Sequence, residues 1–291
     1  MTTRTPPSLV AVPVFFGPAM VVEEHQGFAP SAGKPAAAVA SWQALGIPMN
    51  LAAPPPVSRD NLARAHDPAY VDGVLGGRLR NGFGNTSAAV AASLPHTSGA
   101  MLAAARAALA NGRVAVAPVS GFHHASHAAA FGFRTCNGLM VAALALLASG
   151  EAHRIAIPDF DQHYGDGTDQ IIGQLRVDGI VHHSEGRDHR TESDAAPFLD
   201  RIDDIVETMR GCEVMLYQAG ADPHVDDPLG GWLTTAQLHE RDRRVFAAAR
   251  RIGLPVAWNL AGGYQSPLRK VLDIHDNTLR ACAGVFLHTE G

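Results

Sequence analysis

The sequence predicts an α/β fold in which helices cover both faces of one mostly parallel β-sheet. Short apolar runs alternate along the chain with Ala- and Leu-rich stretches of helical character, an order that is typical of this class. Glycines and ionisable residues begin directly after four of the apolar runs, where an open parallel sheet presents its ligand-binding loops. With 291 residues, 46% of them hydrophobic, the chain can bury one large core, so we expect a single domain over residues 1–291.

Five apolar runs are expected to form strands of this sheet. They are Leu9–Phe16, Arg113–Pro118, Arg154–Pro158, Glu213–Gln218 and Pro255–Leu260. The stretches between them predict helices at Ser98–Asn111, Gly138–Ser149, Phe198–Arg210 and Thr235–Arg251. The proline-rich segment Leu51–Val57 is expected to be a stiff loop and not a domain boundary.

Charge and apolar patterning argue against several function classes. The net charge is −5 and no Lys/Arg cluster occurs, so we expect no nucleic-acid partner, because phosphate binding needs clustered cations. The longest apolar helical run, Gly138–Gly150, is shorter than the roughly 20 residues of a membrane span. Cys136, Cys212 and Cys282 are widely spaced and expected to be buried free thiols. The N-terminus fits a first strand better than a secretory leader, so we expect a cytoplasmic protein with no membrane partner.

Polar loops follow four of the predicted strands. Their sequences, in chain order, are VSGFHHASH, DFDQHYGDG, AGADPHVDDPLGG and AGGYQSP. The carboxyl ends of parallel strands lie at one edge of a sheet, where loops from neighbouring strands converge. Residues that are far apart in the sequence are therefore expected to share one site.

The second of these loops carries the spacing of a metal site. Asp161 and His163 form an Asp-x-His pair, whose side chains point to the same side in an extended segment. A carboxylate and a neutral imidazole suit Zn²⁺, and a catalytic zinc usually has three protein ligands. The best third ligand is Asp222, in the Gly-Ala-Asp that follows another strand. On its own this pair fits a solvated loop, and the convergence of four loops favours the metal.

The tandem histidines His123 and His124 are the second chemical feature. Two histidines beside a glycine at a strand end suit a general base and an electrostatic partner near neutral pH. Their carboxylate partners are expected to be Asp159 and Asp166, which the metal does not need. Such carboxylates fix the tautomer and the basicity of a histidine.

Six motifs together resemble the histone deacetylase and acetylpolyamine amidohydrolase superfamily. In chain order they are ARAHDPAYVDGVL (63–75), GFHHA (121–125), GFRTCN (132–137), DFDQHYGDGT (159–168), GAD with DDPLGG (220–222 and 226–231) and AGGY (261–264). The first resembles an N-terminal helix motif of that family. The resemblance implies a three-layer arginase/deacetylase-like α/β fold around one catalytic zinc. It also implies hydrolysis of acetyl or other acyl groups from lysine side chains or polyamines.

The resemblance assigns the metal ligands and the acid–base residues. The Asp-x-His pair and Asp222 would bind one zinc per chain. Asp159 would orient His123, and Asp166 would orient His124. Of the two histidines, the resemblance favours His124 as the general base and acid.

Four further residues receive roles from the resemblance. Tyr264 is similar to the tyrosine whose hydroxyl donates to the carbonyl oxygen in the transition state. Gly132 and Phe133 are similar to part of the wall of the acyl-lysine tunnel. Asp227 matches a position near the metal with a structural role.

This sequence departs from the family pattern in three places. Arg134 stands where many members have cysteine. His182 takes the place of a serine at the family's monovalent-cation site, which puts a cation near Asp159 in doubt. A Pro-Gly-Thr-Gly loop is replaced by residues 184–193, and no aromatic residue opposite Phe133 can be assigned.

Two other functions stay open at this stage. A two-metal ureohydrolase would need a further metal-binding aspartate close after His163, and the sequence offers Asp166 only at the third position. An inactive acyl-amine binding module would be indicated by loss of Tyr264 or His124, and both are present.

The substrate is expected to be an acylated amine, either a small molecule or a peptide. Glu23 and Glu24 follow the first strand and are candidates for attracting a cationic amine to the rim, although a solvated helix start explains them equally well. The sequence leaves open the acyl chain length, the choice between zinc and iron, and the number of chains per assembly, a homodimer included.

Overall fold

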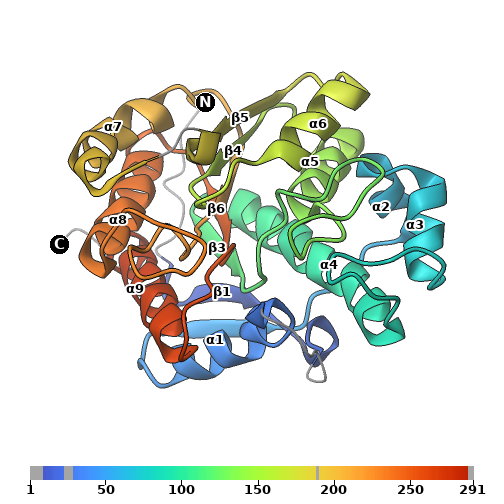
Figure 1. The fold of residues 1–291 in the computed structure, drawn as a ribbon. Coiled ribbons are helices and arrows are strands. Elements are labelled where there is room, and N and C mark those ends of the chain that lie inside the picture. The colour runs from blue at the N-terminus through green and yellow to red at the C-terminus, as the bar shows by residue number, and fades with distance from the viewer. Residues whose placement is uncertain (1–8, 23–28, 188–189, 288–291) are drawn as a thin grey trace.

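One parallel sheet crosses the whole molecule (Figure 1). The computed structural model describes residues 9–22, 29–187 and 190–287, and within them seven strands stand in the order β2-β1-β3-β7-β6-β4-β5. Each neighbouring pair is parallel. The strands are β1 Val12–Phe15, β2 Met49–Ala52, β3 Val114–Ala117, β4 Ile155–Asp159, β5 Ile180–Ser184, β6 Val214–Gln218 and β7 Val256–Asn259.

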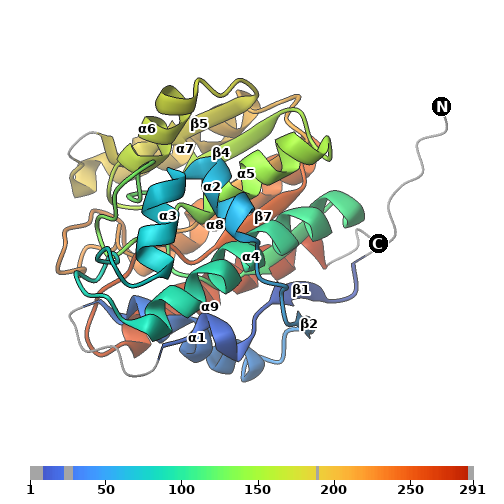
Figure 2. The ribbon, with the colours of Figure 1, turned by 90° about the vertical axis from the view of Figure 1, so that its right-hand side faces the viewer.

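Helices cover both faces of the sheet, which confirms the predicted fold class. Helices α1, α7, α8 and α9 lie on one side in Figure 1, and Figure 2 shows α2 to α5 across the other. The helices are α1 Lys34–Gln43, α2 Arg59–Ala65, α3 Pro68–Leu75, α4 Ala88–Asn111, α5 Gly138–Ser149, α6 Asp166–Leu175, α7 Ala195–Glu207, α8 Thr235–Arg251 and α9 Arg269–Phe286. Short 3-10 helices are η1 Pro18–Met20, η2 Pro30–Ala32, η3 Glu185–Arg187 and η4 Glu192–Asp194. None of the described helices is both long enough and apolar enough to cross a membrane.

The central strands supply both hydrophobic cores. In β6, Met215 and Tyr217 pack into the core under α7, α8 and α9, while Val214 and Leu216 pack into the core under α4 and α5. Side chains alternate between the faces of a strand, so a strand that is apolar at every position can fill both layers. This explains why the buried strands appear in the sequence as continuous apolar runs.

All five predicted strands are observed, while the sequence analysis did not predict β2 or β5. Residues Leu51 and Ala52 belong to β2, although the sequence analysis placed them in a stiff loop. The residues of β2 are mostly exposed, because it is the edge strand next to β1. An exposed edge strand needs no apolar run, which is the signal on which the other strands were predicted.

The helix predictions were accurate for two helices and need correction for the others. Helices α5 and α8 have the predicted bounds, whereas α4 starts at Ala88 and carries Pro95 in its interior. Helix α7 runs from Ala195 to Glu207, three residues earlier than predicted at each end. The motif at 63–75 spans two helices, because Asp67 caps α3 and Pro68 occupies its first turn. Helices α1, α6 and α9 were not predicted.

The four strands that precede the polar loops are neighbours in the sheet. They stand side by side in the order β3, β7, β6 and β4. The loops after them therefore leave the same edge of the sheet next to one another. This arrangement brings together residues from the four motifs.

Candidate active site

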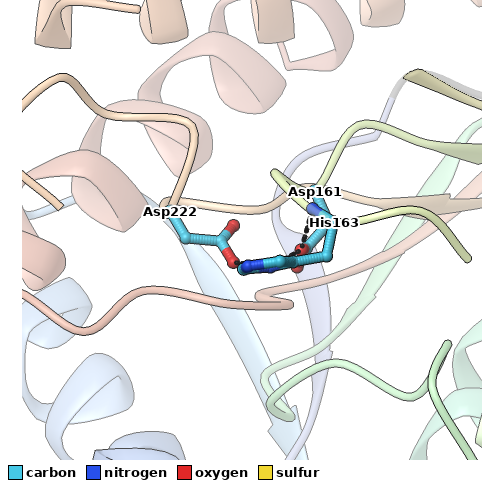
Figure 3. Close-up of side chains that lie close together, drawn as sticks. All are labelled: Asp161, His163 and Asp222. Atoms are coloured by element: carbon cyan, nitrogen blue, oxygen red, sulfur yellow. Dashed lines mark hydrogen bonds and ion pairs between the residues drawn. The ribbon is translucent and has the colours of Figure 1, made fainter. Parts of the chain in front are cut away.

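Two loops bring together two carboxylates and one imidazole (Figure 3). Asp161 and His163 lie in the loop after β4, and Asp222 lies in the loop after β6. Nδ1 of His163 is 3.4 Å from Oδ1 of Asp161 and 3.4 Å from Oδ2 of Asp222. Strand β4 ends at Asp159, and residues 161–163 form a bend, so the expected extended segment was wrong. The loop itself, and not strand alternation, turns the two side chains toward Asp222.

This cluster fits a divalent metal ion. One ligand atom from each residue lies within 4.8 Å of the other two, and it is the one such cluster of three among the described residues. Both aspartates are buried, and Oδ2 of Asp222 accepts no hydrogen bond from the described residues. A buried carboxylate oxygen without a donor needs a cation. Two carboxylates and one imidazole are a donor set that Zn²⁺ accepts.

The protonation of the cluster shows how strongly the site attracts positive charge. Burial, together with the negative charge of Asp161, raises the pKa of Asp222 to about 7. The nearby carboxylates of Asp161 and Asp222 raise the pKa of His163 to about 10. A bound metal ion takes over the role of these protons, so metal binding releases them.

Glycines let the backbone approach the two carboxylates. The amide of Gly262 donates to Oδ2 of Asp161 at 2.8 Å, and a Cβ atom on Gly262 would lie 2.0 Å from Oδ2 of Asp222. A Cβ atom on Gly220 would lie 2.7 Å from Cα of Asp161. Both distances are too short for any other residue type. The glycines of the third and fourth polar loops are therefore part of the site.

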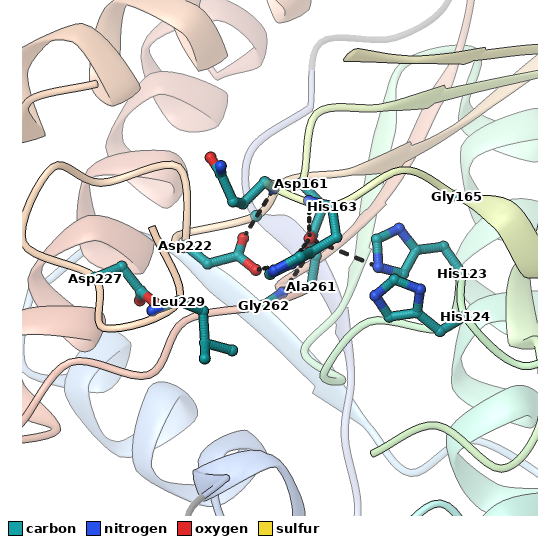
Figure 4. Close-up of polar contacts among 12 residues, drawn as sticks. His123, His124, Asp161, His163, Gly165, Asp222, Asp227, Leu229, Ala261 and Gly262 are labelled. Carbon is teal, nitrogen blue, oxygen red and sulfur yellow. Dashed lines mark hydrogen bonds and ion pairs between the residues drawn. The ribbon is translucent and has the colours of Figure 1, made fainter. Parts of the chain in front are cut away.

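Each of the tandem histidines contacts its predicted carboxylate, and Figure 4 shows both rings beside Asp161 and His163. Nδ1 of His123 lies 2.7 Å from Oδ2 of Asp159, and Nδ1 of His124 lies 2.7 Å from Oδ1 of Asp166. A carboxylate only accepts, so Nδ1 carries the proton in each ring. The centroid of the His124 ring is 5.7 Å from that of His163. The geometry thus joins all four residues to the metal cluster.

Burial and neighbouring charges give the two histidines different protonation states. Burial, assisted by the charge of His123, lowers the pKa of His124 to about 4. Burial alone would lower the pKa of His123 as well, but the carboxylates of Asp159 and Asp161 raise it to about 9. At neutral pH His124 is therefore a neutral base and His123 is a cation. This difference agrees with the assignment of His124 as the general base.

Tyr264 is held at the end of the loop after β7. Its backbone amide donates to Oδ2 of Asp227 at 2.8 Å, and Oδ1 of Asp227 accepts from the amide of Leu229 at 3.0 Å. Asp227 thus ties two loops together, which agrees with the structural role expected of it. Burial raises the pKa of the Tyr264 phenol well above its usual value, so the hydroxyl keeps its proton and can donate it.

Gly132 lies against the ring of His124, and Phe133 lies beside Tyr264. Gly132 has a φ of +55°, and a Cβ atom there would lie 2.5 Å from Cδ2 of His124. The ring centroid of Phe133 is 5.9 Å from that of Tyr264 and 6.3 Å from that of Phe83. Phe83 is an aromatic neighbour of Phe133 that the sequence analysis did not predict, and the aromatic residue opposite Phe133 in the tunnel stays unassigned. Phe83 lies in the segment Asn-Gly-Phe-Gly-Asn, whose turn residues are its one sequence signal.

Two buried basic residues lie near Tyr264: Arg134, which the sequence analysis named as a departure from the family motif, and Lys34, which it did not single out. Arg134 donates to the hydroxyl of Tyr264 at 3.3 Å and to that of Ser31 at 2.9 Å. Nζ of Lys34 donates to the carbonyl of Ala261 at 2.6 Å. Lys34 opens α1, far from every motif, and no sequence signal could have placed it here.

His182 stands beside the carboxylate of Asp159. A Cβ atom on Gly165 would lie 2.6 Å from Oδ2 of Asp159 and 3.1 Å from Nε2 of His182. Nδ1 of His182 lies 2.6 Å from Oδ1 of Asp169. An imidazole in this position offers a cation no oxygen ligand, and the monovalent cation near Asp159 stays a prediction. Glu23 and Glu24, the expected rim residues, lie outside the described residues.

Comparisons with known proteins agree with this geometry. A family model described as the histone deacetylase domain matches residues 33–189, more than half of the chain. An uncharacterized protein of Picosynechococcus sp. is 29% identical over 249 residues, which cover 77% of this chain and 82% of that protein. The crystal structure of the HDA15 HD domain matches with a TM-score of 0.78 and 19% identity, covering 97% of this chain and 91% of that one. The structural match shows a shared fold.

Proposed function

Because this chain belongs to the histone deacetylase domain family, we propose that it is a zinc-dependent amidohydrolase that removes an acetyl or other acyl group from an amine. Family membership makes the chain a deacetylase-type hydrolase, and our proposal adds the zinc and the substrate. The observation that carries the proposal is the buried cluster of Asp161, His163 and Asp222 next to a neutral His124. The substrate is an acylated small molecule or peptide in the cytoplasm, and residues 1–291 act as one catalytic domain.

Asp161, His163 and Asp222 would hold the metal. Bound there, Zn²⁺ supplies a Lewis acid that polarises the amide carbonyl and lowers the pKa of a water molecule. His124 supplies the base, because Nδ1 is engaged with Asp166 and the neutral ring therefore offers Nε2 as the acceptor.

His124 and Tyr264 can supply the proton transfers and the hydrogen bond that amide hydrolysis needs. His124 takes one proton from water as the water oxygen bonds to the acyl carbon. The phenol of Tyr264 donates a hydrogen bond to the carbonyl oxygen as negative charge develops on it. The C–N bond then breaks, and His124 returns its proton to the amine nitrogen. The products are the free amine and a carboxylic acid, which ionises to the carboxylate.

The two alternative functions are less well supported. A ureohydrolase needs a second metal site, and the described residues contain one cluster of three ligands. A binding module needs no acid–base pair, yet His124 and Asp166 are in contact at 2.7 Å.

The metal and the activity are best tested together. We expect the zinc-loaded protein to bind about one zinc per chain and to hydrolyse acetyl-lysine peptides, acetylated polyamines or longer acyl-lysines. Asp222→Asn should lose the zinc at low free metal and lose turnover with it, because it removes a buried charged ligand. Asp226→Asn is the matched control, since Asp226 is exposed in the same loop and should change neither quantity.

Three outcomes would contradict the proposal. Equal turnover in metal-free protein would remove the metal from the reaction. About two ions per chain, with hydrolysis of a guanidinium substrate, would favour the ureohydrolase. One zinc per chain and tight binding of a hydroxamate, with no turnover of any acylated amine, would favour the binding module.

A further inference from the structure

Arg134 places a buried positive charge next to Tyr264 in the candidate site. The residue is 4% exposed, and two of its nitrogens donate to the hydroxyls of Ser31 and Tyr264. The third, Nε, is buried and has no hydrogen-bond partner. Within the described part of the chain no carboxylate forms an ion pair with Arg134. A guanidinium does not lose its proton in a protein, so this charge is always present.

The carboxylates of the region are already committed to other partners. Asp161 and Asp222 face the metal position, and Asp227 accepts from the backbone amides of Tyr264 and Leu229. Burial lowers the pKa of Lys34 to about 7, and the charge of Arg134 contributes in the same direction. Burying a charge without a counter-charge is unfavourable, so an anionic ligand would be stabilised beside Arg134.

Arg134 also lines a cavity that is open to solvent on one side. Its empty volume of about 550 Å³ includes the solvent at that opening. Its wall contains the rings of Phe122 and Phe133 and the hydroxyls of Ser31 and Thr135. Among the described lining residues, Arg134 has the one charged side chain.

We propose that Arg134 binds the free carboxylate of a dicarboxylic acyl group, so that the enzyme removes groups of the malonyl and succinyl class. The inference rests on the proposed amide hydrolysis and specifies the acyl group. Tyr264 would contact the carbonyl oxygen, and Arg134 donates to the hydroxyl of Tyr264 at 3.3 Å, so the guanidinium would lie within reach of a short acyl chain. An acetyl methyl group would remove water from the guanidinium and offer it no acceptor, whereas a carboxylate accepts charge-assisted hydrogen bonds.

A pair of substrates of equal length isolates the role of the carboxylate. N-butyryl-lysine and N-succinyl-lysine in the same peptide have four-carbon acyl groups that differ in the terminal group. We expect wild-type kcat/KM to favour succinyl over butyryl by at least about tenfold. In Arg134→Gln this ratio should fall at least about a hundredfold. A general loss of kcat through Tyr264 affects both substrates equally and cancels in the ratio.

Two further variants and one binding measurement complete the test. Arg134→Lys keeps the charge and should retain part of the preference. Arg106→Gln is the matched control, because Arg106 is exposed and pairs with Glu151, and its ratio should equal that of the wild type. Isothermal titration calorimetry should show that succinate binds the zinc-loaded wild type at least about tenfold more tightly than butyrate. Arg134→Gln should abolish that difference.

The outcomes separate the two proposals. A wild type that cleaves acetyl or butyryl groups at least as well as succinyl overturns the role of Arg134 and leaves the amidohydrolase intact. A wild type that prefers octanoyl groups also overturns the role of Arg134, and it would indicate that the apolar wall of the cavity selects the acyl group. Binding of succinate that depends on Arg134, with no turnover of any acylated peptide, supports the anion site and overturns the proposed function. If Arg134→Gln does not fold, the succinyl-to-butyryl ratio of kcat/KM in the wild type and in Arg134→Lys tests the proposal instead.

Discussion

Replacing Tyr264 with phenylalanine removes one oxygen atom from the candidate site. The ring stays next to Phe133, and the backbone amide keeps its bond to Asp227 at 2.8 Å. The described contact that is lost is the hydrogen bond from Arg134, which is 3.3 Å long. The substitution therefore deletes the proposed donor to the substrate while it leaves the metal ligands and the histidines in place.

Two magnitudes follow from this geometry. Loss of one oxyanion donor lowers kcat by about 10²–10³, which corresponds to about 3–4 kcal/mol. Loss of the contact with Arg134 lowers the free energy of unfolding by about 1 kcal/mol, at the low end for a charged donor because the bond is long. The effect on catalysis should therefore be much larger than the effect on stability.

Steady-state kinetics and urea unfolding measure the two effects. Tyr264→Phe should keep about one zinc per chain and bind a hydroxamate with modest weakening, and kcat should fall at least about a hundredfold. Tyr70→Phe is the matched control, since its buried hydroxyl donates to the carbonyl of Thr135 at 2.8 Å. That variant should lose similar stability and keep its kcat. A Tyr264→Phe enzyme with more than half of the wild-type kcat would refute the assignment of Tyr264 as the oxyanion donor.

Two further predictions concern stability and metal affinity. Nδ1 of the buried His66 donates to the carbonyl of Ser126, and its Nε2 accepts from the amide of Asn137. These two contacts need the neutral imidazole, and burial lowers the pKa of His66 to about 4. The unfolded chain binds this proton below about pH 6.5, so the free energy of unfolding should fall by roughly 3 kcal/mol as the pH drops from 6.5 to 4. Urea titrations with EDTA present should show a smaller fall in His66→Gln, and an equal fall would contradict the assignment. Gly262→Ala places a Cβ atom 2.0 Å from Oδ2 of Asp222 and should weaken zinc binding at least about tenfold in a competition assay with a chelator. Gly284→Ala should leave the zinc affinity unchanged, because a Cβ atom there lies in open space. Unchanged zinc affinity in both variants would contradict the close approach of Gly262 to Asp222.

The sequence by itself determined the sheet and the main chemical groups. Buried parallel strands such as β4 and β6 need apolar side chains on both faces, so their positions are visible as continuous runs. The polar residues that follow them, such as Asp161 and Asp222, lie at the ligand-binding edge of any such sheet. Local order along the chain was therefore enough to predict which residues would meet, as the cluster shows.

The tertiary structure decided what the local sequence could not express. Lys34 and Phe83 carry no spacing signal for this site, because they reach it from separate elements through packing. Arg134 follows the predicted tunnel residues in the sequence, but only the fold shows its contact with Tyr264. His123 and His124 are adjacent and identical in type, yet burial and the nearest carboxylates make one a cation and the other a neutral base. Protonation depends on which charges and how much protein surround a group in three dimensions, and neither quantity is fixed by its neighbours along the chain.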